Sequence, residues 1–84
     1  MEIHELVDTV QSKADLVSFL QALSQDLKTN PGEWENATLE RYLEALAAWL
    51  ADLSGYYRNR GIAEPASPSW KDIADMLVAA KIYE

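Results

Sequence analysis

The chain lacks cysteine and has few of the residues that break helices. Its 84 residues include one histidine, three glycines and three prolines. Without cysteine, disulfide bonds and thiol chemistry are excluded. Because small secreted domains often depend on disulfides, the absence of cysteine favours a cytoplasmic location.

Long apolar runs are missing as well. The longest one, residues 45–51, has seven residues, whereas a membrane-spanning helix needs about 20. The first residues are acidic and contain no hydrophobic signal core. We therefore expect a protein that does not associate with membranes.

Basic residues are scarce relative to acidic ones. The chain has seven lysines and arginines and 14 aspartates and glutamates, which gives a net charge of −7. An acidic surface repels phosphate groups, so nucleic acids and anionic membranes are disfavoured as partners. A protein with a basic surface remains possible as a partner. The alternative interpretation is that the acidic residues only maintain solubility.

Helical periodicity is the main pattern that is present. Apolar residues recur at spacings of three and four in four segments, residues 3–10, 13–29, 38–58 and 70–82. The pattern predicts one all-α domain over 1–84, a small bundle of three main helices plus a short N-terminal helix, with two extended connecting loops. The apolar arc of the 38–58 helix is wide, so we expect that helix to be central, with neighbours on two sides.

Polar residues mark the expected helix starts. Ser12 and Ser69 are predicted N-caps, and each has an aspartate three residues later, as in a capping box. For the helix over 38–58, both Asn36 and Thr38 are suitable caps, and the sequence does not decide between them.

Catalytic, cofactor and metal motifs are not found. No serine lies in a nucleophile motif and no glycine-rich loop is present, so we expect neither an enzyme nor a cofactor. His4 and Asp8 would supply only two of the three or four ligands that a metal site needs. Asp52 lies in an apolar stretch and would suit acid–base chemistry if buried. The alternatives are an exposed Asp52 or an ion pair with Arg58 or Arg60.

The three tryptophans are the most unusual feature. Tryptophan, tyrosine and arginine dominate interface hot spots, so an exposed aromatic patch would bind a partner. In the alternative interpretation, Trp49 lies in the core while Trp34 and Trp70 pin loops to it. The arginines near Tyr56 and Tyr57 are expected to stack on aromatic rings or to pair with nearby acidic residues, rather than to bind nucleic acid. The candidate partner or ligand surface consists of Trp34, Asp52, Tyr56, Tyr57, Arg58 and Trp70.

A series of single residues also runs through most of the chain. It comprises Trp34-Glu35-Asn36, Leu39, Leu43-Glu44-Ala45, Trp49, Asp52, Gly55-Tyr56-Tyr57, Asn59, Pro68-Ser69-Trp70, Ala74, Leu77, Ala79-Ala80 and Tyr83-Glu84. This pattern resembles a family of short bacterial helical proteins of unknown function. The resemblance implies a bacterial, intracellular, helical protein and brings no activity, cofactor or partner. Such proteins are similar in size to small immunity proteins and antitoxins.

Three functional hypotheses follow from the sequence. The first is a non-enzymatic interaction protein, which binds another protein or forms a homodimer through its acidic surface and aromatic patch. An immunity or antitoxin role is one version of this hypothesis. The second is a ligand or substrate pocket between the last two helices, near Asp52, Tyr56, Tyr57 and Trp70. The third is a purely structural domain.

Overall fold

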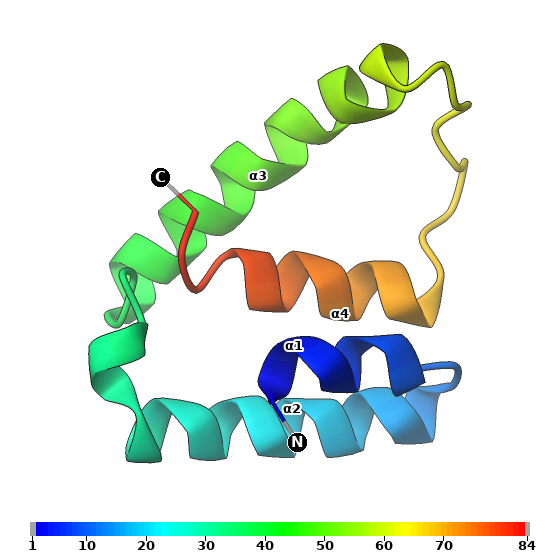
Figure 1. Cartoon of the computed structure of the whole chain (residues 1–84). Coiled ribbons are helices and arrows are strands. Elements are labelled where there is room, and N and C mark those ends of the chain that lie inside the picture. Colours follow the sequence, from blue (N-terminus) through cyan, green and yellow to red (C-terminus); the bar gives the residue numbers. More distant parts are fainter. Residues whose placement is uncertain (1, 84) are drawn as a thin grey trace.

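A computed structural model describes residues 2–83, and these residues are all-α (Figure 1). No strand is present among them. The prediction of a small helical bundle with a short leading helix is therefore confirmed. The elements are α1 (Ile3–Leu6), η1 (Val7–Thr9), α2 (Lys13–Thr29), η2 (Pro31–Glu33), α3 (Leu39–Asn59) and α4 (Trp70–Ala79), where η denotes a single 3-10 turn.

The predicted serine caps are present at the starts of α2 and α4. The Ser69 hydroxyl accepts from the Asp72 backbone N–H at 3.0 Å, and the Asp72 carboxylate accepts from the Ser69 N–H at 2.9 Å, which completes a capping box. At α2, the Ser12 hydroxyl accepts from the Asp15 N–H at 3.1 Å. The Asp15 carboxylate, however, accepts from the N–H of Gln11, one residue earlier than a capping box requires.

The structure decides between the two candidate caps of α3. The Thr38 hydroxyl accepts from the Arg41 N–H at 3.2 Å and is the cap. Asn36 is 8% exposed and instead holds the C-terminal segment. Its side-chain amide donates to the carbonyl oxygens of Ala80 at 3.0 Å and Tyr83 at 2.8 Å. Its backbone N–H donates to the Lys81 carbonyl at 3.0 Å. The last helix therefore ends at Ala79, three residues earlier than predicted, in a turn held by Asn36.

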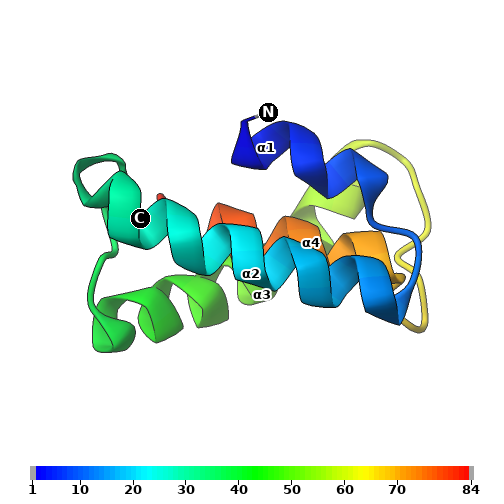
Figure 2. The same cartoon turned by 90° about the horizontal axis from the view of Figure 1, so that it is seen from below.

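The hydrophobic core lies where α1, η1, α2 and α4 meet. In Figure 2, α2 and α4 run alongside each other, and α1 lies beside them. Small residues allow this close packing, since Ala74 and Ala80 are both completely buried. The buried core side chains are Ile3, Val7, Val10, Phe19, Leu23, Trp34, Ala74 and Val78.

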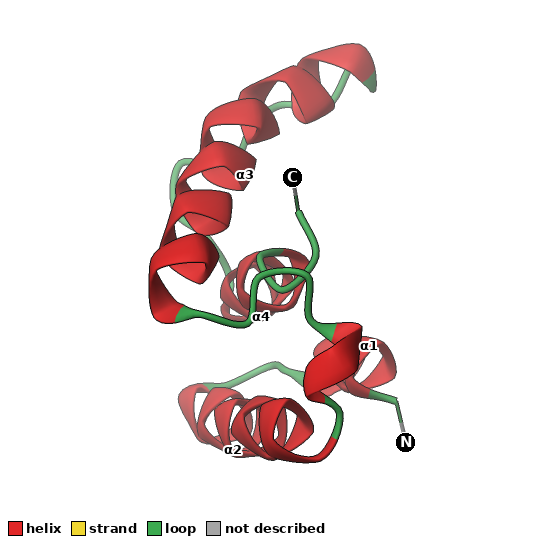
Figure 3. Cartoon of the chain, turned by 90° about the vertical axis from the view of Figure 1, so that its left-hand side faces the viewer, coloured by secondary structure: helices red, strands yellow, loops and turns green. Residues whose placement is uncertain are grey.

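The expectation that the 38–58 helix is central is wrong. The central helix is α4, which contacts η1, α2 and α3. In Figure 3, α3 stands on the far side of α4 from α2 and α1. Across its 21 residues, α3 contributes a single buried residue, Ala45. The wide apolar arc of α3 therefore faces one helix on one side and is left open on another. None of the described helices combines the length and the apolar character needed to cross a membrane.

Candidate functional site

An open cleft lies between α3 and α4. The two helices are joined near the start of α3, where the Tyr42 hydroxyl donates to the Leu77 carbonyl at 2.5 Å. From there α3 rises away from α4, and the loop over residues 60–69 closes the wide end (Figure 1). The cleft has a volume of about 890 Å³. Its apolar and aromatic lining comes from Trp49, Leu50, Leu53, Tyr56, Tyr57, Ile62, Pro68, Ile73, Met76, Val78, Ala79, Ile82 and Tyr83.

Polar side chains at this cleft mostly pair with one another. The Lys71 ammonium lies 3.1 Å from the Asp75 carboxylate and 3.7 Å from that of Asp8. The hydrogen bond to Asp75 raises the pKa of Lys71, and burial opposes that effect. The Tyr83 hydroxyl donates to the Asp52 carboxylate, and this hydrogen bond raises the pKa of Tyr83. The charged groups of the cleft are therefore engaged in local pairs, which leaves the apolar wall as its main feature.

Three of the six residues in the predicted surface lie together in this cleft. Asp52, Tyr56 and Tyr57 all line it. Asp52 is an exposed residue whose partner is Tyr83, rather than Arg58 or Arg60. Of the two expected roles for these arginines, stacking is confirmed for Arg60, whose guanidinium lies 4.5 Å from the centre of the Tyr56 ring.

The other three predicted residues lie elsewhere. Arg58 is exposed near the end of α3, and Trp70 is 41% exposed at the first position of α4. Trp34 does not belong to this surface. It is 8% exposed and stacks on Tyr42, with ring centres 5.8 Å apart. Tyr42 precedes Tyr56 by 14 residues, or about 21 Å along a helix. The alternative interpretation is confirmed for Trp34, which pins its loop to the core. It is wrong for Trp49, which is only partly buried and lines the cleft instead of the core.

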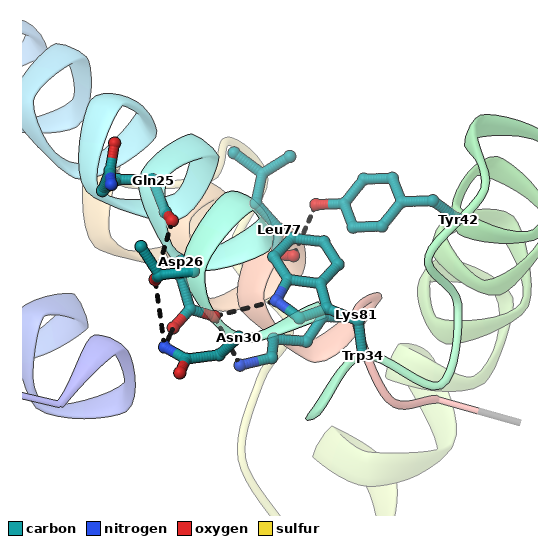
Figure 4. Close-up of polar contacts among 8 residues, drawn as sticks. Gln25, Asp26, Asn30, Trp34, Tyr42, Leu77 and Lys81 are labelled. Atoms are coloured by element: carbon teal, nitrogen blue, oxygen red, sulfur yellow. Dashed lines mark hydrogen bonds and ion pairs between the residues drawn. The ribbon is translucent and has the colours of Figure 1, made fainter. Parts of the chain in front are cut away.

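Trp34 belongs to a buried polar cluster that the sequence did not reveal (Figure 4). The Lys81 ammonium lies 2.9 Å from the Asp26 carboxylate, and their side chains are 3% and 14% exposed. The Trp34 indole N–H donates to the same carboxylate oxygen at 2.8 Å, and Asn30 donates to the other at 3.1 Å. The hydrogen bond from Lys81 is the main cause that lowers the pKa of Asp26, and burial opposes it. This cluster joins α2, the first loop and the turn after α4.

Lys81 lies near the end of the helix that the sequence predicts over 70–82. A lysine at a helix end is expected to interact with the helix dipole. The structure instead places Lys81 beyond α4, paired with an aspartate 55 residues away in the sequence. No spacing rule predicts such a pair.

A second feature of α3 is a row of six residues that we call the leucine seam. The exposed fractions of its side chains reach 73% at Leu39, 52% at Leu43 and 46% at Leu50. The other three members are partly buried. The seam consists of Leu39, Leu43, Leu46, Leu50, Leu53 and Tyr57. These spacings predicted core packing, whereas the structure leaves half of the row exposed.

A family model matches residues 12–84, which is most of the chain. The chain belongs to a family of unknown function, DUF7660. The DUF7660 match begins after η1 and includes α2, α3 and α4. It therefore also covers the leucine seam and the cleft residues on α3 and α4. Searches of curated proteins and of solved structures found no match.

Metal-binding side chains do not gather at any one point in the part of the chain that the structure describes. No three histidine, cysteine or acidic side chains lie close enough there to hold a metal ion. His4 lines the cleft and remains a lone candidate ligand.

Proposed function

We propose that this protein is a non-enzymatic interaction domain that binds another polypeptide through α3. The observation that supports the proposal is that α3 has 21 residues and buries only Ala45, while Leu39, Leu43 and Leu50 stay exposed. Burial of one leucine side chain stabilises a complex by about 1.5–3 kcal/mol. Contiguous exposed apolar residues on a small protein are typical of interaction sites.

The pairing of charged groups in the cleft also favours binding over catalysis. A general acid or base must be within reach of a substrate and free to exchange its proton. Asp52 accepts from Tyr83, and Lys71 lies between Asp75 and Asp8. A partner that covers α3 would meet apolar side chains bordered by these pairs. Binding of a basic toxin, as in an immunity or antitoxin protein, is one version of this function, since the net charge of −7 would steer a basic partner.

Site-specific photo-crosslinking in the native host tests the proposal. A photoreactive amino acid replaces Leu43 in one variant and Val17 in the control, because Val17 is also apolar and 48% exposed but lies on α2. We expect the Leu43 position to capture one defined polypeptide, either a second copy or another protein, and the Val17 position to capture none. Equal yields at the two positions, or no product at Leu43, would contradict the proposal.

A second candidate function is the binding of a small apolar ligand in the cleft. It is favoured by the 890 Å³ volume and by Asp52, Tyr56 and Tyr57 in its lining, because ligand sites are concave and mainly apolar with a few polar groups. Trp49 also lines the cleft, so its fluorescence reports occupancy. In a variant with Trp34 and Trp70 replaced by Phe, we expect the dye 8-anilinonaphthalene-1-sulfonate to quench Trp49 saturably. Quenching that is absent, or that persists in Tyr56→Ala, would argue against this candidate.

A further inference from the structure

We propose that the partner of α3 is α3 of a second copy, and that the two helices pair in antiparallel orientation along the leucine seam. This inference rests on the proposed function, because it names the polypeptide that covers α3. Four observations lead to it: the spacing of the seam, the residues that flank it, the charge of α3, and the order of its charged residues.

The spacing of the seam is that of a coiled coil. Successive seam residues are separated by four, three, four, three and four positions. These separations average 3.6, and their alternation of four and three is the heptad pattern that keeps one apolar row facing a partner helix. The series of spacings is the same when read from either end, so two antiparallel copies leave no seam residue unmatched. The matched pairs are Leu39 with Tyr57, Leu43 with Leu53, and Leu46 with Leu50, each formed twice.

The two flanks of the seam differ in a way that leaves room for a partner. The flank toward α4 carries Tyr42, which bonds to Leu77, and the cleft-lining Trp49 and Tyr56. The opposite flank carries Ala47 and Ser54, which are small and exposed, and the Ser54 hydroxyl donates to the Glu64 carboxylate of the following loop at 2.8 Å. Small residues beside a seam allow two helix backbones to approach closely. Leu50, Leu53 and Tyr57 of the seam also line the cleft, so a second helix would meet the seam along the edge of the cleft, on the flank of Ala47.

The charge of α3 permits self-association despite the net charge of −7 on the whole chain. Three acidic residues (Glu40, Glu44, Asp52) and three basic residues (Arg41, Arg58, Arg60) lie between residues 39 and 60, so this stretch is neutral. Two copies that meet elsewhere bring acidic surfaces together, which is unfavourable.

The order of these charges selects the antiparallel orientation. The first two turns of α3 carry Glu40, Arg41 and Glu44 and are net acidic, whereas its end carries Arg58 and Arg60. An antiparallel pair places the acidic end of each helix near the basic end of the other, and a parallel pair would bring like charges together. The two helix dipoles are also opposed in the antiparallel pair, which is the more favourable arrangement.

The interface should be small and the dimer weak. A helix of 21 residues is about 31 Å long, which places the contact near the lower limit for specific interfaces, about 1,000 Å² in total. We therefore expect a dissociation constant in the micromolar range. Sedimentation velocity between about 1 μM and 1 mM covers that range.

Sedimentation of the whole chain and of two double variants tests the self-association. Leu43→Gln with Leu50→Gln disrupts the seam, and Val17→Gln with Leu20→Gln changes similarly exposed apolar residues on α2. We expect the wild-type chain and the α2 variant to dimerise alike, and the seam variant to bind at least about 100-fold more weakly. A wild-type chain that stays monomeric throughout, or equal weakening in both variants, would overturn the inference. Circular dichroism confirms that each variant is folded.

Cross-linking tests the orientation, and the absence of native cysteine makes single-cysteine variants possible. In the matched register, residue 47 of one copy lies opposite residue 49 of the other. The two cysteines of an Ala47→Cys dimer are therefore about 3 Å apart along the helix axis. Residue 54 of one copy lies opposite residue 42 of the other, so the two cysteines of a Ser54→Cys dimer are about 18 Å apart along the helix axis. A short bis-maleimide should therefore link Ala47→Cys dimers and not Ser54→Cys dimers. Equal linking of both variants would indicate a parallel or nonspecific pair and would exclude the antiparallel one.

The two proposals can fail separately. If photo-crosslinking at Leu43 captures another protein while the chain remains monomeric, the interaction function stands and self-pairing is wrong. If Leu43 captures nothing and the chain is monomeric, both proposals are wrong.

Discussion

Removal of the negative charge of Asp26 should strongly destabilise the fold. In Asp26→Asn, the ammonium of Lys81, whose side chain is 3% exposed, loses its counter-charge at 2.9 Å. Breaking a buried pair from one side costs about 3–5 kcal/mol, because the remaining charge is left uncompensated. The Trp34 ring, 5.4 Å from the ammonium, offers partial compensation. We therefore expect a loss of about 3 kcal/mol, which lowers Tm by about 12–24 °C in a domain of this size.

The opposite substitution should cost less. Lys81→Met keeps the apolar stem, and the Asp26 carboxylate retains the hydrogen bonds from Trp34 at 2.8 Å and Asn30 at 3.1 Å. The Asp26 side chain is also 14% exposed, so its carboxylate keeps some contact with water. We expect a loss of about 1–2 kcal/mol. The double variant should be no less stable than Asp26→Asn alone, because it removes the stranded charge.

Urea unfolding at pH 7, followed by circular dichroism, gives the free energy of unfolding for all four proteins. The reasoning is refuted if Asp26→Asn loses less than about 1 kcal/mol, or if the losses of the single variants simply add in the double variant. Additivity would mean that the two side chains are not energetically coupled.

Two further predictions concern the same end of the molecule. Lys81 holds the pKa of Asp26 below its usual value of 3.8. The resulting stability is present above the unfolded pKa and is lost as pH falls through the lower folded pKa, so the urea midpoint of the wild-type chain should fall more steeply below about pH 4 than that of Lys81→Met. Equal slopes for the two proteins would argue against the ion pair. Asn36→Ala removes the donor to the carbonyls of Ala80 and Tyr83. We expect the free energy of unfolding to fall by about 2–4 kcal/mol and hydrogen exchange to become faster in the turn over residues 80–83. Unchanged exchange there would show that Asn36 does not hold that turn.

The helices themselves follow from local sequence. Ser12 and Ser69 satisfy free N–H groups at helix starts, and this depends only on residues within one turn. The apolar spacings of three and four predicted the bounds of α2 in full and those of α3 to within one residue at each end. These features are short-range, so they can be read without knowing what each helix contacts.

The candidate site was predictable in part for the same reason. Asp52, Tyr56 and Tyr57 share one stretch of α3, and the structure places all three in one cleft. Trp34 was assigned to that surface by residue type alone, and its stacking on Tyr42 could not be foreseen. Residue type indicates that a side chain favours burial or an interface, but not which of the two it enters.

The arrangement of the helices was decided only by the tertiary structure. By its composition α3 was a suitable central helix, yet α4 occupies that position. The small side chains of Ala74 in α4 and of Ala80 directly after it allow neighbours to approach closely. Asp26 and Lys81 are 55 residues apart and meet only once α2 and the end of α4 are in place. Local rules determine which segments are helical, whereas the choice of neighbours depends on the packing of all faces at once, and a single sequence does not specify that packing through spacing alone.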